Sequence, residues 1–231
     1  QKDRIPPTSQ AECDEALAIL RDHAEEWAAM PIQERIALLE ALVPTTHAVA
    51  EQWVDEGCRA KGLTRGTPAE GEEWLGGPSA VLRNLQLLIV ALRDVRDTGS
   101  PQLPGAVTTR DDGQVVAPVF PTDTWDKLLF AGFTAEVWMD PSVTRENLKD
   151  TMAVFYDEKS PKVKVGLVLR AGNVSSIGPI DALYKLFAEG EVVLLQFNPV
   201  NEHLGPIIHQ AYAELVRPRF LRVVNCRLAQ V

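Results

Sequence analysis

Apolar residues recur at a spacing of three or four between residues 11 and 97, which predicts a series of amphipathic helices. A first helix is expected through residues 17–27, and a second begins near Pro31. Pro44 is expected to end or kink the second helix, because proline lacks a backbone N–H donor. A third long helix follows the glycine-rich segment 62–77. We interpret the apolar faces of these helices as core.

The pattern changes between residues 98 and 160 to short apolar runs that turn residues interrupt. Residues 114–120 and 128–139 favour β-strands, and residues 142–156 favour a helix. Edge strands or loops are indicated by Pro118, Pro121 and Pro141. We interpret the segment as an edge hairpin or arm of the kind that serves subunit contact.

The last third of the chain has the most regular alternation of elements. Strands are predicted at residues 162–170, 191–197 and 220–225, and helices at 179–190 and 204–216. The first strand is a continuous apolar run, which is typical of a sheet covered on both faces. Because crossover connections are right-handed, this β-α-β-α-β order predicts a parallel three-stranded sheet with helices on its faces.

The expected fold class is therefore α/β, with an N-terminal helical region, an incomplete Rossmann-like parallel β-α-β-α-β unit and a small β arm. The corresponding domains are a helical N-terminal region over residues 1–100, a β arm and connecting segment over 101–160, and the first part of a nucleotide-binding domain over 161–231.

Charge and composition exclude several classes of function. The chain has 231 residues, 45% of them hydrophobic, which is typical of a globular protein. Its formal net charge of −9 excludes a general nucleic-acid binder, since no global positive field opposes the phosphates. The longest apolar runs have only a few residues, so we expect no membrane partner. The N-terminal residues show no apolar signal core.

Cysteine usage indicates a reducing compartment. The three cysteines, Cys13, Cys58 and Cys226, are widely separated and form no CxxC pair, so a disulfide scaffold or zinc knuckle is not expected. We interpret them as packing thiols of a cytoplasmic protein.

Two loops carry the candidate chemistry, because ligands of open parallel sheets bind beyond the carboxyl ends of the strands. They are residues 170–178 and 196–202. In the first loop, Asn173 and two serines offer hydrogen bonds at the start of a helix, where an anion or a developing oxyanion is favoured. The alternative is that these side chains only cap the helix.

Other catalytic and nucleotide-binding motifs are missing from the sequence. It contains no GxGxxG, GxxxxGK[ST], GxSxG or HExxH. His203 and His209 are six residues apart, off one helical face, so a metal pair is not expected. Ser175 and Asp181 have no nearby histidine for a proton relay.

Residues 166–208 resemble the NAD(P)-dependent aldehyde dehydrogenase superfamily, specifically an atypical branch that has AGNVSS in place of the commoner PWNFP loop. The segments 31–42 and 61–78 look like the part of that branch that leads into the cofactor domain. The resemblance covers most of this chain but only about the first half of a family member.

The resemblance implies a role for residues of both loops. Asn173 stands where the family keeps an asparagine whose amide helps to hold the oxyanion of a thiohemiacetal. Leu169, Arg170 and Gly172 would line the cofactor side of the same turn by their backbone. The implied cofactor is NAD or NADP, and the implied substrate is a small aldehyde.

In the second loop the sequence departs from the family. Gln196 occupies the position of a lysine that usually binds the adenosine ribose or its phosphate, which weakens the case for NADP. Pro199 stands where the family often has a ribose-binding glutamate, and Asn198 is the residue that could replace it.

Family members place a cysteine nucleophile and a glutamate base in their second half, and none of the cysteines here fits that position. We therefore expect an N-terminal fragment of a homo-oligomeric enzyme, without turnover of its own. The alternative is a non-catalytic binding or assembly module with a vestigial nucleotide cleft, which the loss of lysine at Gln196 favours. An unrelated nucleotide-binding α/β protein would carry a phosphate-loop fingerprint, which this sequence does not have.

Overall fold

The computed structural model describes residues 6–158, 162–169 and 172–225. By their contacts the residues form two compact units, Gln1–Val90 with Lys159–Val231, and Ala91–Glu158. The division into residues 1–100, 101–160 and 161–231 remains a proposal for the domain organisation of the whole protein.

The first helix of the first unit is α1 (Gln10–Ala29). Ser9 and Glu12 cap its N-terminus by a reciprocal capping box. The helices that follow are α2 (Ile32–Ala48), α3 (Ala50–Lys61), α4 (Pro68–Trp74), the π-helical segment η1 (Leu75–Ser79) and α5 (Ala80–Thr98). The last part of α5, from Ala91 on, is counted with the second unit. Helix α3 ends at Gly62, whose φ of 69° lies in the left-handed region that favours glycine. Gly77 has non-helical dihedral angles, so the backbone is kinked between α4 and α5.

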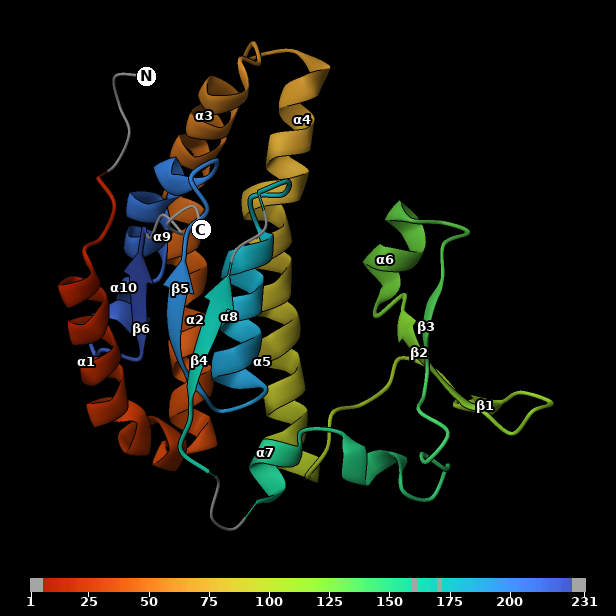
Figure 1. Ribbon diagram of the computed structural model, residues 1–231. Coiled ribbons are helices and arrows are strands. Elements are labelled where there is room, and N and C mark those ends of the chain that lie inside the picture. The colour runs from red at the N-terminus through yellow and green to blue at the C-terminus, as the bar shows by residue number, and fades with distance from the viewer. Residues whose placement is uncertain (1–5, 159–161, 170–171, 226–231) are drawn as a thin grey trace. The chain divides into compact units, whose positions relative to one another are not determined.

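The sheet of the first unit has three parallel strands in the order β4 (Val165–Leu169), β5 (Val192–Gln196) and β6 (Leu221–Val224). They are connected by α8 (Ile177–Phe187) and by η3 (Glu202–Leu204), α9 (Gly205–Ala211) and α10 (Ala213–Val216). The predicted β-α-β-α-β order and parallel sheet are confirmed (Figure 1).

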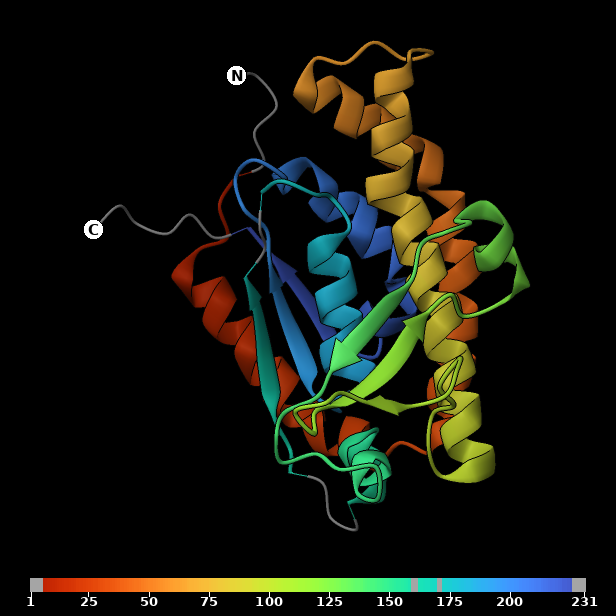
Figure 2. The ribbon, with the colours of Figure 1, turned by 90° about the vertical axis from the view of Figure 1, so that its right-hand side faces the viewer.

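Helices cover both faces of this sheet. Figure 2 shows the strands between α1 on one side and α8 on the other, and both helices contact β5. The Trp27 ring of α1 is fully buried, with its centroid 5.4 Å from that of Phe187 and 4.8 Å from that of Phe220. Because the central strand is covered from both sides, Val192–Leu195 are buried without alternation. The expectation that the first strand, over residues 162–170, is covered on both faces was wrong. Burial alternates along β4, which is the outer strand of this sheet, and Leu167 and Leu169 are exposed.

The second unit is an antiparallel sheet with short helices. Its strands have the order β1 (Thr108–Thr109), β2 (Val115–Phe120) and β3 (Ala135–Trp138). The helical segments are α6 (Thr124–Leu129), the 3-10 helix η2 (Leu148–Thr151) and α7 (Val154–Asp157). A small core forms where Val115, Val143 and Leu148 pack together.

Several expectations for the middle segment were wrong. The run 128–139 begins in a helix, because the Asp123 carboxylate accepts a hydrogen bond from Asp126 N at 2.8 Å and caps α6. Only 135–138 of this run are a strand, and 142–156 contains two short helical turns instead of one helix. Pro118 lies in β2, which is the central strand of this sheet and not an edge strand. At Pro118 itself, however, β2 pairs only with β3, because β1 pairs only with Val115 and Val116.

Pro44 does not end α2, which continues to Ala48. Leu42 and Thr46 are fully buried on either side of the proline. The Thr45 hydroxyl also donates to the Ala211 carbonyl at 2.6 Å. These contacts hold the last turn in place despite the backbone hydrogen bond that proline cannot make.

One helical stretch of the described residues, Pro68–Thr98, is long and apolar enough to cross a membrane, with 33% of its most apolar window buried. This is weak evidence for a span, since a core helix passes the same test. The stretch is interrupted at Gly77 and Pro78. Along α5 the buried positions recur at helical spacing, as in a helix that packs one face against a protein core: Val81, Leu85, Ile89, Leu92 and Val95.

Candidate functional site

The carboxyl ends of the three parallel strands meet at one edge of the sheet. Leu169 pairs with Gln196, and Gln196 pairs with Val224. The two loops selected from the sequence therefore start side by side, as the topology of a parallel sheet requires. Leu169 is exposed and Gln196 is half-buried at this edge. Arg170, which was also expected here, lies outside the described residues.

Hydrogen bonds and contacts join the two loops. The Asn201 amide donates to the Gly172 carbonyl at 3.0 Å, and Asn201 is buried. A Cβ added to Gly172 would lie 3.7 Å from the Asn198 amide nitrogen, so these two predicted residues are in close proximity. The Asn198 side chain accepts from Val200 N at 3.0 Å and shapes its own turn. The sequence analysis missed Asn201, because its partner is 29 residues away along the chain.

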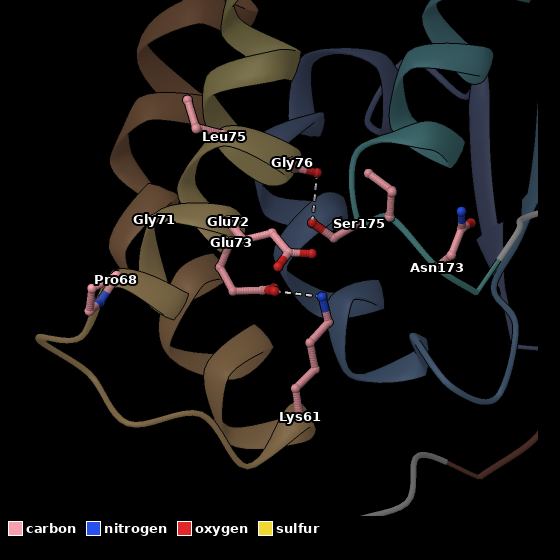
Figure 3. Close-up of a pocket in the computed structure, with 10 residues that line it drawn as sticks. Lys61, Pro68, Gly71, Glu72, Glu73, Leu75, Gly76, Asn173 and Ser175 are labelled. Carbon is pink, nitrogen blue, oxygen red and sulfur yellow. Dashed lines mark hydrogen bonds and ion pairs between the residues drawn. The ribbon is translucent and has the colours of Figure 1, made fainter.

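Asn173 borders a cavity of about 400 Å³ that lies within the first unit. The other walls come from the end of α3, from α4 and from η1 (Figure 3). Asn173 itself is exposed, and its amide makes no hydrogen bond to any residue that the structure describes. Asn173 thus adds an exposed neutral amide to the lining of this cavity, beside the carboxyl edge of the sheet.

Two serines fix the loop that carries Asn173. Ser175 Oγ accepts a hydrogen bond from Trp53 Nε1 at 3.0 Å and donates one to the Gly76 carbonyl at 3.2 Å. The Ser176 N–H donates to the same carbonyl at 3.1 Å. Both serines are buried. Ser176 is the N-cap residue of α8, but its side chain makes no capping bond, so the structure does not support the alternative of side-chain capping.

An ion pair between the exposed Lys61 and the buried Glu73 forms another wall of the cavity. Lys61 Nζ lies 2.5 Å from Glu73 Oε1, and the Glu73 side chain is only 2% exposed. Figure 3 shows this pair below Ser175, with Glu72 beside it. Gly57 leaves the space for the carboxylate, since a Cβ at that position would collide with Glu73 Oε2. The pair neutralises both charges, and Glu72 adds an exposed carboxylate to the lining.

Glu70 positions the start of α4. Its carboxylate accepts hydrogen bonds from Gly66 N at 2.6 Å and from Trp74 Nε1 at 2.9 Å. The Gly66 N–H, followed by the Trp74 indole, lowers the pKa of Glu70 from its ordinary value, because both donors favour the ionised form. The turn before α4 is therefore held by a carboxylate that stays charged at neutral pH.

Among the described residues, no thiol lines this cavity. Cys58 is buried in α3 and Cys13 is partly buried in α1, and neither lines it. Cys226 lies outside the described residues. Within the described ranges, no three His, Cys, Asp or Glu side chains are grouped so that they could hold a metal ion.

No protein-family model matches the sequence, and no curated protein matches it either. Solved structures do share the fold. One is a protein of Sinorhizobium meliloti 1021 in complex with NAD, described as a methylmalonate-semialdehyde dehydrogenase, with a TM-score of 0.58 and 12% identity; the match covers 96% of this chain and 35% of that one.

A second is the NADP-dependent glyceraldehyde-3-phosphate dehydrogenase of Bacillus halodurans C-125 in complex with NADP, with a TM-score of 0.53 and 16% identity, covering 96% of this chain and 37% of that one. A third is an NAD-dependent benzaldehyde dehydrogenase from Corynebacterium glutamicum, with a TM-score of 0.55 and 14% identity, covering 97% and 38%. At these identities the similarity shows the fold alone. The chain spans less than two fifths of the length of these dehydrogenases, and the resemblance seen in the sequence is confirmed at the level of the fold.

Proposed function

We propose that this chain is part of an NAD(P)-dependent aldehyde dehydrogenase, which oxidises an aldehyde, or reduces an acyl derivative, through a thiohemiacetal on a cysteine outside this chain. The observation that carries the proposal is the exposed amide of Asn173, which lines a cavity beside the carboxyl edge of the parallel sheet. The shared fold of dehydrogenases complexed with NAD and with NADP supports it.

In this proposal Asn173 donates a hydrogen bond from its side-chain amide to the oxyanion of the thiohemiacetal. A neutral donor held in place before the reaction stabilises charge that appears only along the reaction coordinate. Removing one such donor costs about 100- to 1000-fold in kcat. The cavity beside Asn173 would admit the carbonyl end of the aldehyde.

The residues at the sheet edge fit a nucleotide. Gln196 presents a side chain that can both donate to and accept from ribose hydroxyls, and Asn198 lies beside it in the same loop. Leu169 and Gly172 would line the same side by their backbone. When bound, NAD or NADP supplies the hydride acceptor. Because Gln196 carries no charge, it offers no ion pair to a ribose phosphate, which favours NAD.

We further propose that the whole protein is a cytoplasmic homo-oligomer whose contacts include the second unit. This unit exposes large apolar side chains on and after α6, with Trp125 69% and Leu129 71% exposed. A group of neighbouring large apolar side chains that are exposed to this extent is typical of protein contact surfaces.

The test is an assay of aldehyde-dependent NADH and NADPH formation by the whole protein that carries this sequence. Asn173→Ala is expected to lower kcat by about 100- to 1000-fold with a much smaller change in KM. Asn173→Asp keeps the shape but replaces the donor with a carboxylate, and we expect it to be at least as damaging. An unchanged kcat in both variants would refute the role of Asn173.

The 231-residue chain by itself is the matched control, since the proposed nucleophile is not in it. We expect no turnover from it, and aldehyde-dependent NADH formation by this chain alone would overturn the proposal that it lacks the nucleophile.

The second candidate function is a non-catalytic assembly module, which the exposed apolar side chains of the second unit favour. Calorimetric titration of the whole protein with NAD and NADP separates the two functions. Binding supports the dehydrogenase, and no binding at millimolar ligand supports the module with a vestigial cleft.

A further inference from the structure

We propose that Ser175 and Trp53 are positioning residues that fix the amide of Asn173 for the reaction. This inference rests on the function proposed above and assigns how this chain holds its oxyanion donor. It concerns the hydrogen-bonded series from Trp53 through Ser175 to Gly76, which joins α3, the loop after β4 and η1.

The geometry of the series is consistent in direction. The indole N–H of Trp53 donates to Ser175 Oγ at 3.0 Å, and the hydroxyl then donates to the Gly76 carbonyl at 3.2 Å. Trp53 is fully buried, and Ser175 is 6% exposed. A buried hydroxyl that accepts one hydrogen bond and donates another is restricted in its orientation, so the loop is held two residues after Asn173. Figure 3 shows the Ser175 hydroxyl directed at Gly76 and Asn173 on the adjoining strand-end loop.

The backbone of η1 is built to receive this hydroxyl. Because helical dihedral angles are interrupted at Gly77, the Gly76 carbonyl can accept hydrogen bonds from the loop, and it takes both the Ser175 hydroxyl and the Ser176 N–H. A Cβ added to Gly77 would lie 3.0 Å from Ser175 Oγ and 3.1 Å from Trp53 Nε1. Both distances are shorter than ordinary van der Waals contact, so any larger residue at Gly77 would push against the Ser175 hydroxyl and the Trp53 indole.

The series also explains how the AGNVSS loop can replace the commoner PWNFP loop of the family that the sequence resembles. Ser175 stands at the position of the second proline of that motif. Proline restricts the backbone covalently through its fixed φ. Here the restriction comes instead from hydrogen bonds to two distant segments, and it depends on Trp53 and Gly76.

The experiment measures kcat and KM of the whole protein with Ser175→Ala, Trp53→Phe and Asn173→Ala, singly and as the double variant of Ser175 and Asn173. Ser175→Ala is expected to lower kcat by about 10- to 100-fold, because a donor displaced by a fraction of an ångström no longer meets the oxyanion. Trp53→Phe should lower kcat in the same direction. In the Asn173→Ala background, Ser175→Ala should cause no further loss, since its effect passes through Asn173.

Two variants elsewhere in the first unit serve as matched controls. Thr45→Ala removes a hydroxyl that donates to the Ala211 carbonyl at 2.6 Å, and Trp27→Phe removes an indole that donates to the Leu186 carbonyl at 3.2 Å. Both delete a comparable interhelical hydrogen bond away from the loop, and we expect them to lower thermal stability while leaving kcat unchanged.

The readout that does not depend on activity is hydrogen exchange of the Ser176 amide in the 231-residue chain, which Ser175→Ala should accelerate at least tenfold. If Asn173→Ala lowers kcat but folded Ser175→Ala and Trp53→Phe do not, this inference is wrong and the proposed function stands. If Ser175→Ala lowers kcat equally in both backgrounds, its role is structural and the inference is also wrong. Full activity of Asn173→Ala would refute the proposed function itself, and this inference with it.

Discussion

Arg35 is the largest fully buried charged side chain in the part of the chain that the structure describes, and its substitution tests how the first unit is held together. It lies on α2 and is fully buried. Its guanidinium donates to the Met30 carbonyl at 3.2 Å, to the Leu186 carbonyl at 3.5 Å and to the Trp27 carbonyl. It also stacks over the Trp27 ring, with Cζ 4.3 Å from the centroid. The planar guanidinium therefore donates hydrogen bonds to carbonyls at the C-terminal ends of both α1 and α8.

Two substitutions separate the charge of Arg35 from its shape. Arg35→Met removes the charge together with its desolvation cost. The Trp27 carbonyl keeps a hydrogen bond from Met30 N, and the Leu186 carbonyl keeps one from Trp27 Nε1. Of these three carbonyls, that of Met30 is the one that loses its donor, so with the lost cation–π contact we expect a net destabilisation of about 1–3 kcal/mol.

Arg35→Lys is chemically more conservative but should be worse. Lysine keeps a buried charge and its desolvation cost, yet an ammonium cannot reach three carbonyls in one plane while it stacks on Trp27. We expect a loss of about 3–5 kcal/mol, the cost of an incompletely compensated buried charge. This is a large fraction of the about 5–15 kcal/mol that keeps a typical domain folded.

The assay is urea unfolding of the 231-residue chain, followed by circular dichroism and tryptophan fluorescence, with equal m-values as the criterion that the variants unfold alike. If Arg35→Lys were as stable as the wild type, or more stable than Arg35→Met, the reasoning from planar geometry would be refuted.

Three further predictions concern single side chains. The Tyr212 hydroxyl is fully buried without a hydrogen-bond partner among the described residues, and burial raises the pKa of Tyr212. Tyr212→Phe should therefore increase the free energy of unfolding by about 0.5–2 kcal/mol. A clear loss of stability in urea unfolding would contradict this prediction. The Ser9 hydroxyl, followed by the Ser9 N–H, lowers the pKa of Glu12. The carboxylate therefore stabilises the fold above the ordinary glutamate pKa, and this contribution is lost as the pH falls through the lowered pKa. The stability difference between wild type and Glu12→Gln should accordingly be largest at neutral pH and vanish in acid, and a difference independent of pH would argue against it. Gln196→Lys should raise the affinity of the whole protein for NADP more than for NAD in calorimetric titration, since a cation at the end of β5 can pair with a ribose phosphate. Equal changes in affinity for both cofactors would show that residue 196 does not lie beside the ribose phosphate.

The parallel unit could be predicted from the sequence because its signals are local. The apolar runs predict the positions of β4 and β5, and the glycine after α8 predicts where that helix ends, each to within a few residues. In the second unit local signals compete. Aromatic and β-branched residues favoured a strand at 128–139, but the capping carboxylate of Asp123 started a helix just before it. Pro44 shows the same competition, since tertiary packing holds α2 together against the local preference.

The same distinction between local and long-range signals applies to the candidate site. The topology of a parallel sheet was enough to place the loops of Asn173 and Asn198 at one edge, because that argument needs only the order of the elements. The contacts that fix these loops join distant parts of the chain: Trp53 and Ser175 are 122 residues apart, and Asn201 and Gly172 are 29 apart. No spacing rule connects a buried tryptophan on α3 to a serine after β4. The loops in which candidate residues lie can therefore be inferred from sequence, whereas the contacts that fix these loops become visible only when helices far apart in the chain pack together.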